Sequence, residues 1–102
     1  MNDRFLSLLG LARKAGKLSL GSDAAADSLK KGSAVRIFLT ADLSPRTVGS
    51  VEAAAEEMGI EVEKTRYSML EIGMAVGKKT GIVVVNDAGF AEKLSALHQQ
   101  AH

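Results

Sequence analysis

Ile82-Val83-Val84-Val85 decides the fold of this chain, because four consecutive β-branched residues make a strand that must be covered on both faces. Val35 to Leu39 (Val-Arg-Ile-Phe-Leu) has the same character and runs into a turn at Ala41-Asp42. Ile60 to Lys64 alternates apolar and charged residues, as a half-covered strand does. Lys17 to Leu20 is predicted to be a short extended link or strand. Covering the central strand requires helices on both sides of a sheet.

Five stretches with capping residues at their starts supply those helices. We expect caps at Asn2 or Asp3, at Ser22 for a helix over Ala24 to Lys31, at Ser44 before Pro45, at Ser68 in a capping box with Glu71, and at Asp87. Glycines close the first four of these helices, at Gly16, Gly32, Gly59 and Gly77.

Helices that alternate with short apolar strands predict an α/β protein built as a three-layer α/β/α sandwich. Crossover connections are right-handed and place helices over the sheet, so we expect a small four-stranded sheet that is mostly parallel or mixed. No linker, repeat or low-complexity stretch interrupts the chain, which predicts a single domain over residues 1–102.

The composition excludes several classes of function. The absence of Cys removes disulfides, thiolate metal sites and cysteine nucleophiles. The apolar runs are too short to span a bilayer, and the N-terminus lacks a signal-peptide pattern, so we expect a cytoplasmic protein without a membrane partner. We also expect no cofactor. The net charge of +1 at first argues against nucleic acid, because nucleic-acid-binding domains are usually strongly basic.

The first candidate site lies at the junction between the first two expected helices. It comprises Arg13, Lys14, Lys17, Gly21, Ser22 and Asp23, with Lys30, Lys31 and Gly32 at the end of the second helix. A helix N-terminus preceded by glycine exposes N–H groups and a positive dipole potential, which suit a phosphate or a base edge. The alternative interpretation is that Arg13 and Lys14 complement the dipole of the first helix, and that Gly16 and Gly21 only form turns.

The second candidate site is the loop Gly77-Lys78-Lys79-Thr80-Gly81, between a helix and a strand. With Gly73 it superficially suggests a P-loop, but three residues separate the glycines, Lys79 follows Lys78, and the order of helix and strand is reversed. We therefore reject nucleotide hydrolysis. A basic loop that sits against an RNA backbone and a plain solvated turn both remain open.

Three further features favour structural interpretations. Asp42 follows a strand, where open α/β sheets often hold catalytic groups, but it has no second catalytic group and is interpreted as a turn residue. His98 and His102 have a helical metal-ligand spacing but lie in the C-terminal tail, so we expect no metal site. Three methionines, Met58, Met69 and Met74, are predicted to pack in the core.

With these segments placed, the chain resembles the ribosomal L-seven-Ae / L-thirty-e family of kink-turn RNA-binding proteins, particularly its small bacterial ribosomal-protein-like members. The matching elements keep their order nearly from end to end: Leu9 to Lys17, Gly21, Leu29 to Gly32, Ala41-Asp42, Met58 to Ile60, Ile72-Gly73 with Gly77-Lys78, and Asp87 to Ala91. The resemblance implies an α/β/α sandwich that binds structured RNA, ribosomal RNA above all, without catalysis.

The resemblance also implies which residues meet the RNA. In the family, the start of the second helix recognises the sheared G·A pairs of a kink-turn, and the loop before the last strand holds extruded nucleotides. Carried over to this chain, the first surface is Lys14, Lys17, Gly21, Ser22 and Asp23, and the second is Gly77, Lys78, Lys79, Thr80 and Gly81.

The chain departs from the family at the base-reading positions. Strong kink-turn binders carry Asn-Glu after the Gly-x of this helix and a Lys three residues beyond the Glu, whereas this chain has Asp23-Ala24 and Asp27. Ionised Asp only accepts hydrogen bonds, whereas Asn both donates and accepts. Ala24 removes an acceptor, and Asp27 would repel phosphate. The resemblance therefore implies RNA binding that is weaker, or directed at a different structured element.

Two other functions remain as alternatives. A protein-binding adaptor on the same fold would use the acidic residues Glu52, Glu56, Glu57, Glu61 and Glu63, although such a run is more often a solubilising face. A small enzyme around Asp42 lacks a second catalytic group, so no enzymatic activity is expected. A DNA partner is not expected either.

The near-neutral charge is a cancellation between segments. Residues 1–36 hold seven Lys and Arg against three Asp, and residues 64–81 hold four Lys and Arg against one Glu. Residues 47–63 contribute five Glu. If the fold gathers the two basic segments at one end, a surface suited to RNA results.

Overall fold

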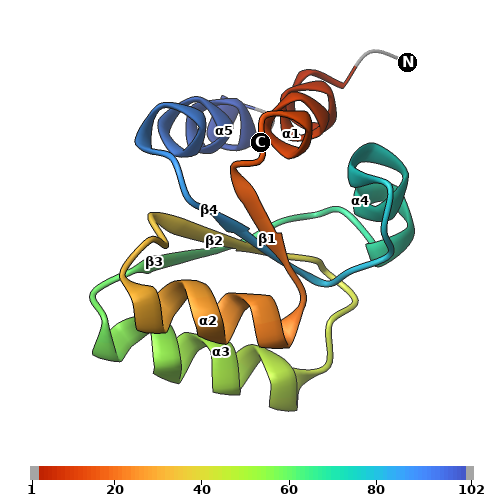
Figure 1. The fold of residues 1–102 in the computed structure, drawn as a ribbon. Helices are drawn as coiled ribbons and strands as arrows, with labels where there is room; N and C mark the ends of the chain where they lie inside the picture. Colours follow the sequence, from red (N-terminus) through yellow and green to blue (C-terminus); the bar gives the residue numbers. More distant parts are fainter. Residues whose placement is uncertain (1–2, 101–102) are drawn as a thin grey trace.

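The computed structural model describes residues 3–100 as three layers, with helices on both faces of one four-stranded sheet (Figure 1). The elements follow in the order α1 (Arg4–Lys14), β1 (Leu18–Leu20), α2 (Ser22–Lys31), β2 (Arg36–Leu39), α3 (Pro45–Glu57), β3 (Glu61–Lys64), α4 (Met69–Val76), β4 (Ile82–Val85) and α5 (Ala88–Gln100). Helices α1, α4 and α5 cover one face, and α2 and α3 cover the other. The predicted α/β/α sandwich is confirmed.

The sheet is mixed, with the strand order β1-β4-β2-β3. Only β2 and β3 are parallel, while β4 runs antiparallel to both of its neighbours. Leu39 at the end of β2 lies beside both Lys64, where β3 ends, and Ile82, where β4 begins. The connection through α4 therefore returns to the same end of the sheet. For this reason the expectation of mostly parallel pairing is wrong, and the mixed alternative holds.

Strand β4 separates two hydrophobic cores. Val83 and Val85 face the core under α1, α4 and α5, whereas Ile82 and Val84 face the core over α2 and α3. All four side chains are at most 2% exposed. The strand is thus covered on both faces, as its unbroken β-branched sequence predicts. Within residues 3–100, no helix is both long enough and apolar enough to cross a membrane.

Four of the five predicted helix caps are present. Asp3, Ser44, Ser68 and Asp87 accept backbone N–H bonds at the starts of α1, α3, α4 and α5, and Ser68 forms the capping box with Glu71. The predicted cap at Ser22 is wrong, because Ser22 is the first residue of α2 and Gly21, one residue earlier, is its N-cap. Asn2, the alternative first cap, lies outside the described residues.

The prediction that three methionines fill the core is wrong for two of them. Met58 is 50% exposed and Met74 is 80% exposed, whereas Met69 is half-buried. The buried residues of α4 are Ile72 and Val76, so the opposite side of this short helix faces solvent. Helical spacing identifies an apolar stripe, but it cannot say how much of that stripe the neighbouring helices cover.

A hydrogen bond ties the start of α1 to the segment after β3. Asp3 Oδ1 accepts from the Leu6 amide at 3.0 Å, and Asp3 Oδ2 accepts from the Tyr67 hydroxyl at 2.6 Å. Burial, together with the bond to the Asp3 carboxylate and its charge, raises the pKa of Tyr67 to about 12. Burial would raise the pKa of Asp3, but bonds from Tyr67 and the backbone outweigh that effect and lower it.

We expect Tyr67→Phe to lower the free energy of unfolding at neutral pH by about 1.5–3 kcal/mol, the usual value of a hydrogen bond to a charged group. Because the folded-state pKa of Tyr67 lies above its ordinary 10.0, its contribution is complete below pH 10 and is lost as the pH rises to about 12. Tyr67 is the only Tyr and Trp is absent, so phenolate absorbance measures this pKa directly. A folded-state midpoint near 10, or one that Asp3→Asn leaves unchanged, would contradict the assignment.

Candidate nucleic-acid interface

The pairing of β1 with β4 brings the start of α2 next to the loop that precedes β4. Gly21 follows β1 directly, and its amide donates to the carbonyl of Ile82, the first residue of β4, at 3.0 Å. Segments that are far apart in sequence therefore meet at one end of the sheet. These segments are the core of the two predicted surfaces.

The N-terminus of α2 is open because its cap is a glycine. Gly21 has φ 90° and ψ 172°, a backbone conformation that essentially only glycine adopts. It offers no side-chain acceptor to the first N–H groups of α2, and Ser22 and Asp23 beside it are exposed. Backbone donors and the positive end of the helix dipole thus face solvent, where an anionic group can bind.

The loop over residues 77–81 divides into an exposed part and a buried part. Lys78 and Lys79 are exposed, whereas Thr80 and Gly81 are buried. The Thr80 hydroxyl donates to the Ile82 carbonyl at 3.0 Å and accepts from its amide at 3.3 Å. A Cβ on Gly81 would lie 2.6 Å from Leu43 Cδ1. Thr80 and Gly81 therefore anchor the loop to the protein, while the side chains of Lys78 and Lys79 lie in solvent.

Gly73 holds this loop against α4. A Cβ at this position would lie 2.9 Å from the Cα of Lys79 and 3.3 Å from its backbone nitrogen. The close approach fixes where Lys78 and Lys79 lie. Sequence reasoning used Gly73 in the rejected P-loop pattern and in the family resemblance, but it missed this positioning role, because the role depends on a tertiary contact.

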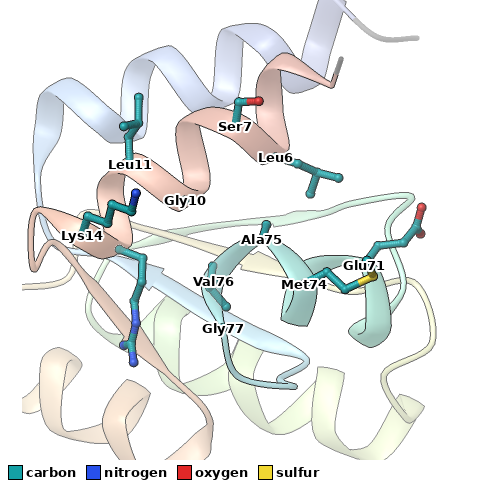
Figure 2. A pocket seen from close by; sticks show the side chains of 11 residues that line it. Leu6, Ser7, Gly10, Leu11, Lys14, Glu71, Met74, Ala75, Val76 and Gly77 are labelled. Carbon is teal, nitrogen blue, oxygen red and sulfur yellow. The ribbon is translucent and has the colours of Figure 1, made fainter. Parts of the chain in front are cut away.

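Arg13 and Lys14 share a groove with Gly77, the first residue of this loop. Both are exposed and line the groove between α1 and α4, whose far wall includes Val76 and Gly77. Figure 2 shows Lys14 and Gly77 towards the same end of this groove. Among residues 3–100, no ion pair includes any of the four cations of this region, which are Arg13, Lys14, Lys78 and Lys79.

The other three predicted cations lie at the opposite end of the sheet. The Lys17 carbonyl accepts a hydrogen bond from the backbone amide of Asn86, which directly follows β4. Lys17 therefore lies at the end of β4, whereas the loop lysines precede its start at Ile82. Lys30 and Lys31 occupy the last turn of α2, about 15 Å along a ten-residue helix from its start. Lys31 also pairs with Asp27 at 3.0 Å. The fold therefore does not gather Lys17, Lys30 and Lys31 with the loop lysines.

One of the five acidic residues suggested for an adaptor, Glu63, is engaged in structural contacts. Glu63 contacts Arg36 at 2.9 Å and His98 Nδ1 at 3.3 Å, and it accepts a hydrogen bond from Ser95, so it links β3 to α5. Its side chain is 15% exposed, which excludes it from the solubilising face suggested by the sequence. Asp42 accepts from the Met69 amide at 3.0 Å and so stabilises the start of α4.

His98 is buried, and His102 lies outside the described residues. In the part of the chain that the structure covers, no three His, Cys, Asp or Glu residues are grouped to hold a metal ion.

Residues 3–95 match the model of the Ribosomal protein L7Ae/L30e/S12e/Gadd45 family, and the chain belongs to this family. It is 34% identical to the RNA-binding protein YlxQ of Bacillus subtilis over 91 residues, which cover 88% of this chain and 90% of YlxQ. It is 30% identical to the large ribosomal subunit protein eL30B of Schizosaccharomyces pombe over 96 residues, which cover 92% of this chain and 82% of that protein.

Solved structures with the same fold include a protein of unknown function from Bacillus halodurans C, with a TM-score of 0.90 and 29% identity. That comparison covers 96% of this chain and 99% of the other. The Giardia lamblia 15.5kD RNA binding protein follows with a TM-score of 0.76 and 17% identity, over 98% of this chain and 89% of the other. At that identity the second comparison supports the fold alone. The expected family resemblance is confirmed.

Gly73→Ala tests whether the contact between α4 and Lys79 positions the loop. The new Cβ meets backbone atoms that cannot rotate away, so we expect a loss of about 1–3 kcal/mol in stability and amide shifts across residues 77–81. Gly49→Ala in α3 is the matched control, because a Cβ there has no neighbour within 4 Å. The control should gain about 0.5–1 kcal/mol from helix propensity. Equal effects of both substitutions on the loop resonances would contradict the role of Gly73.

Proposed function

We propose that this protein is a non-catalytic, ribosome-associated protein that binds structured RNA of the kink-turn kind. The observation that carries the proposal is the Gly21 to Ile82 hydrogen bond, which joins the open N-terminus of α2 to the first residue after the loop that contains Lys78 and Lys79. Family membership and the names of the two relatives, an RNA-binding protein and a ribosomal protein, support the same partner.

The two halves of the interface have different tasks. The backbone N–H groups of α2 suit base edges or a phosphate held in a fixed direction. Lys78 and Lys79 neutralise the RNA backbone and release counterions, which makes affinity depend on salt. Arg13 and Lys14 extend this basic edge towards α1. Lys17, Lys30 and Lys31 act, at most, on a second stretch of RNA.

Recognition of a kink-turn is weakened by the residues at the start of α2. Asp23 is exposed in the first turn, where its charge suits the helix dipole but gives no donor to a base. Ala24 gives no side-chain acceptor. Asp27 lies one turn further and pairs with Lys31, so part of its charge is offset.

Paired lysine substitutions distinguish this interface from general charge attraction. Lys78→Ala with Lys79→Ala should weaken binding to a kink-turn RNA by about tenfold or more and reduce the salt slope by about two, because each phosphate contact contributes about one. Lys30→Ala with Lys93→Ala makes the same change in net charge away from the interface, at two residues that no ion pair among residues 3–100 includes, and should leave both quantities nearly unchanged. Filter binding at several salt concentrations measures both. Equal losses in the two variants would show that the interface is wrongly placed.

Restoring the family's base-reading pair should strengthen recognition. Asp23→Asn with Ala24→Glu supplies a donor and an acceptor, so we expect affinity for a kink-turn to rise by about tenfold, or about 1.4 kcal/mol, with no change for a matched plain duplex. Gel-shift titrations of both RNAs measure the difference. If the unchanged protein already prefers the kink-turn at nanomolar concentration, the proposed weakening is wrong.

A further inference from the structure

Among residues 3–100, three of the five exposed large hydrophobic side chains lie on α1 and α4. Leu11 of α1 is 57% exposed, and Leu70 and Met74 of α4 are 65% and 80% exposed. Single exposed apolar residues are ordinary, but a cluster on adjoining helices marks an interaction surface. The RNA interface at α2 uses none of these three residues.

A groove with an apolar lining runs between these two helices (Figure 2). Its volume is about 940 Å³. The helices approach closely beneath it, since a Cβ on Gly10 would lie 3.1 Å from the Ala75 carbonyl oxygen. Leu11 and Met74 stand on its two walls. A second hollow of about 290 Å³ lies on the other side of Met74, between Leu70 and the loop lysines.

The charges around the groove select an acidic occupant. Arg13 and Lys14 line one end, and Lys78 and Lys79 line the neighbouring hollow. Glu71 is the acidic residue among the groove's lining, and its carboxylate is already engaged with the Ser68 amide at 2.9 Å. An apolar trough with a cationic end is complementary to a segment with an apolar stripe and carboxylates beside it.

The lining favours a protein over a nucleic acid. Bases without a sequence-specific partner bind mainly by stacking on aromatic side chains, and the groove and the hollow contain none. Flexible Met and Leu side chains instead suit the apolar face of a helix, whose anchor residues recur at i, i+3, i+4 and i+7.

We propose that the groove between α1 and α4 docks an acidic amphipathic helix of a protein partner. Apolar anchors of that helix enter between Leu11 and Met74, and its carboxylates meet Arg13 and Lys14. This surface is distinct from the acidic residues that the sequence suggested for an adaptor, and it does not depend on RNA recognition at α2.

A pair of synthetic peptides tests the proposal. Both are about 18 residues long and carry Leu at i, i+3, i+4 and i+7, with Glu at the flanking positions of one and Lys at the same positions of the other. We expect the acidic peptide to bind the isotope-labelled protein and shift the amide resonances of α1 and α4. The basic peptide should bind at least about tenfold more weakly. Equal binding of the two peptides, or shifts confined to other elements, would overturn the proposal.

Neutral substitutions separate docking from folding and from RNA binding. Leu11→Gln and Met74→Gln replace exposed side chains in helices and should each weaken the acidic peptide by about fivefold or more, with circular dichroism and RNA affinity unchanged. Met58→Gln, which changes a methionine that is 50% exposed at the end of α3, is the control and should change nothing.

A photocrosslinking residue in place of Met74 identifies the occupant in cells. The expected adduct is a protein segment whose sequence combines carboxylates with apolar residues at helical spacing, and Leu11→Gln should reduce its yield. An adduct with RNA, with a second copy of this chain or with a segment lacking that pattern, or no adduct, would overturn the proposal.

Discussion

The pairing of β4 with two antiparallel neighbours is the constraint on which the rest of the structure depends. The side chains of β4 alternate between the two hydrophobic cores. Both helical layers, α1 with α4 and α5 on one face and α2 with α3 on the other, therefore pack against this four-residue strand. The same pairing sets the end of β1 against the start of β4, which brings Gly21 to the loop over residues 77–81. Core formation and assembly of the candidate interface are therefore consequences of one register.

The distribution of charge follows from this architecture and explains how a protein of net charge +1 can present a basic surface. Several carboxylates form structural hydrogen bonds. Asp3 accepts from the Tyr67 hydroxyl, Asp42 accepts from a backbone amide at the start of α4, and Glu63 in β3 accepts from Arg36 and from Ser95 in α5. Arg13, Lys14, Lys78 and Lys79 have no carboxylate partner among residues 3–100, so they keep their charge available for ligands. Net charge hides this division because it counts engaged and available groups alike.

Local sequence signals predicted most of the fold and some of the segments that meet at the candidate site. Strands and caps could be predicted because a β-branched run, Ser44 before Pro45 and the Ser68 to Glu71 box act over a few residues. The direction of β4 could not be predicted, because it depends on the end of the sheet at which the connection through α4 re-enters the sheet. For the same reason Lys17 was grouped with Gly21, although β1 carries the chain from one end of the sheet to the other between them. The positioning role of Gly73 and the exposure of Met74 also arise from tertiary packing, which no local pattern reports.

The loop over residues 77–81 links the two proposed surfaces physically. Gly77 ends α4 beside the groove, while Thr80 and Gly81 fasten the loop to the start of β4, next to the N-terminus of α2. Lys78 and Lys79 lie between these points, so the same two lysines could contact an acidic helix in the groove and an RNA backbone at α2.

Two anionic ligands that bind the same cations lower each other's affinity, because the first neutralises charge that the second would use. Thermodynamic linkage makes this effect reciprocal. The factor by which a bound acidic helix lowers the affinity for RNA equals the factor by which bound RNA lowers the affinity for the helix. In the two proposals Leu11 and Met74 contribute only to docking and the α2 N-terminus only to RNA binding. Each affinity could then be set separately, and the coupling would reside in the shared lysines.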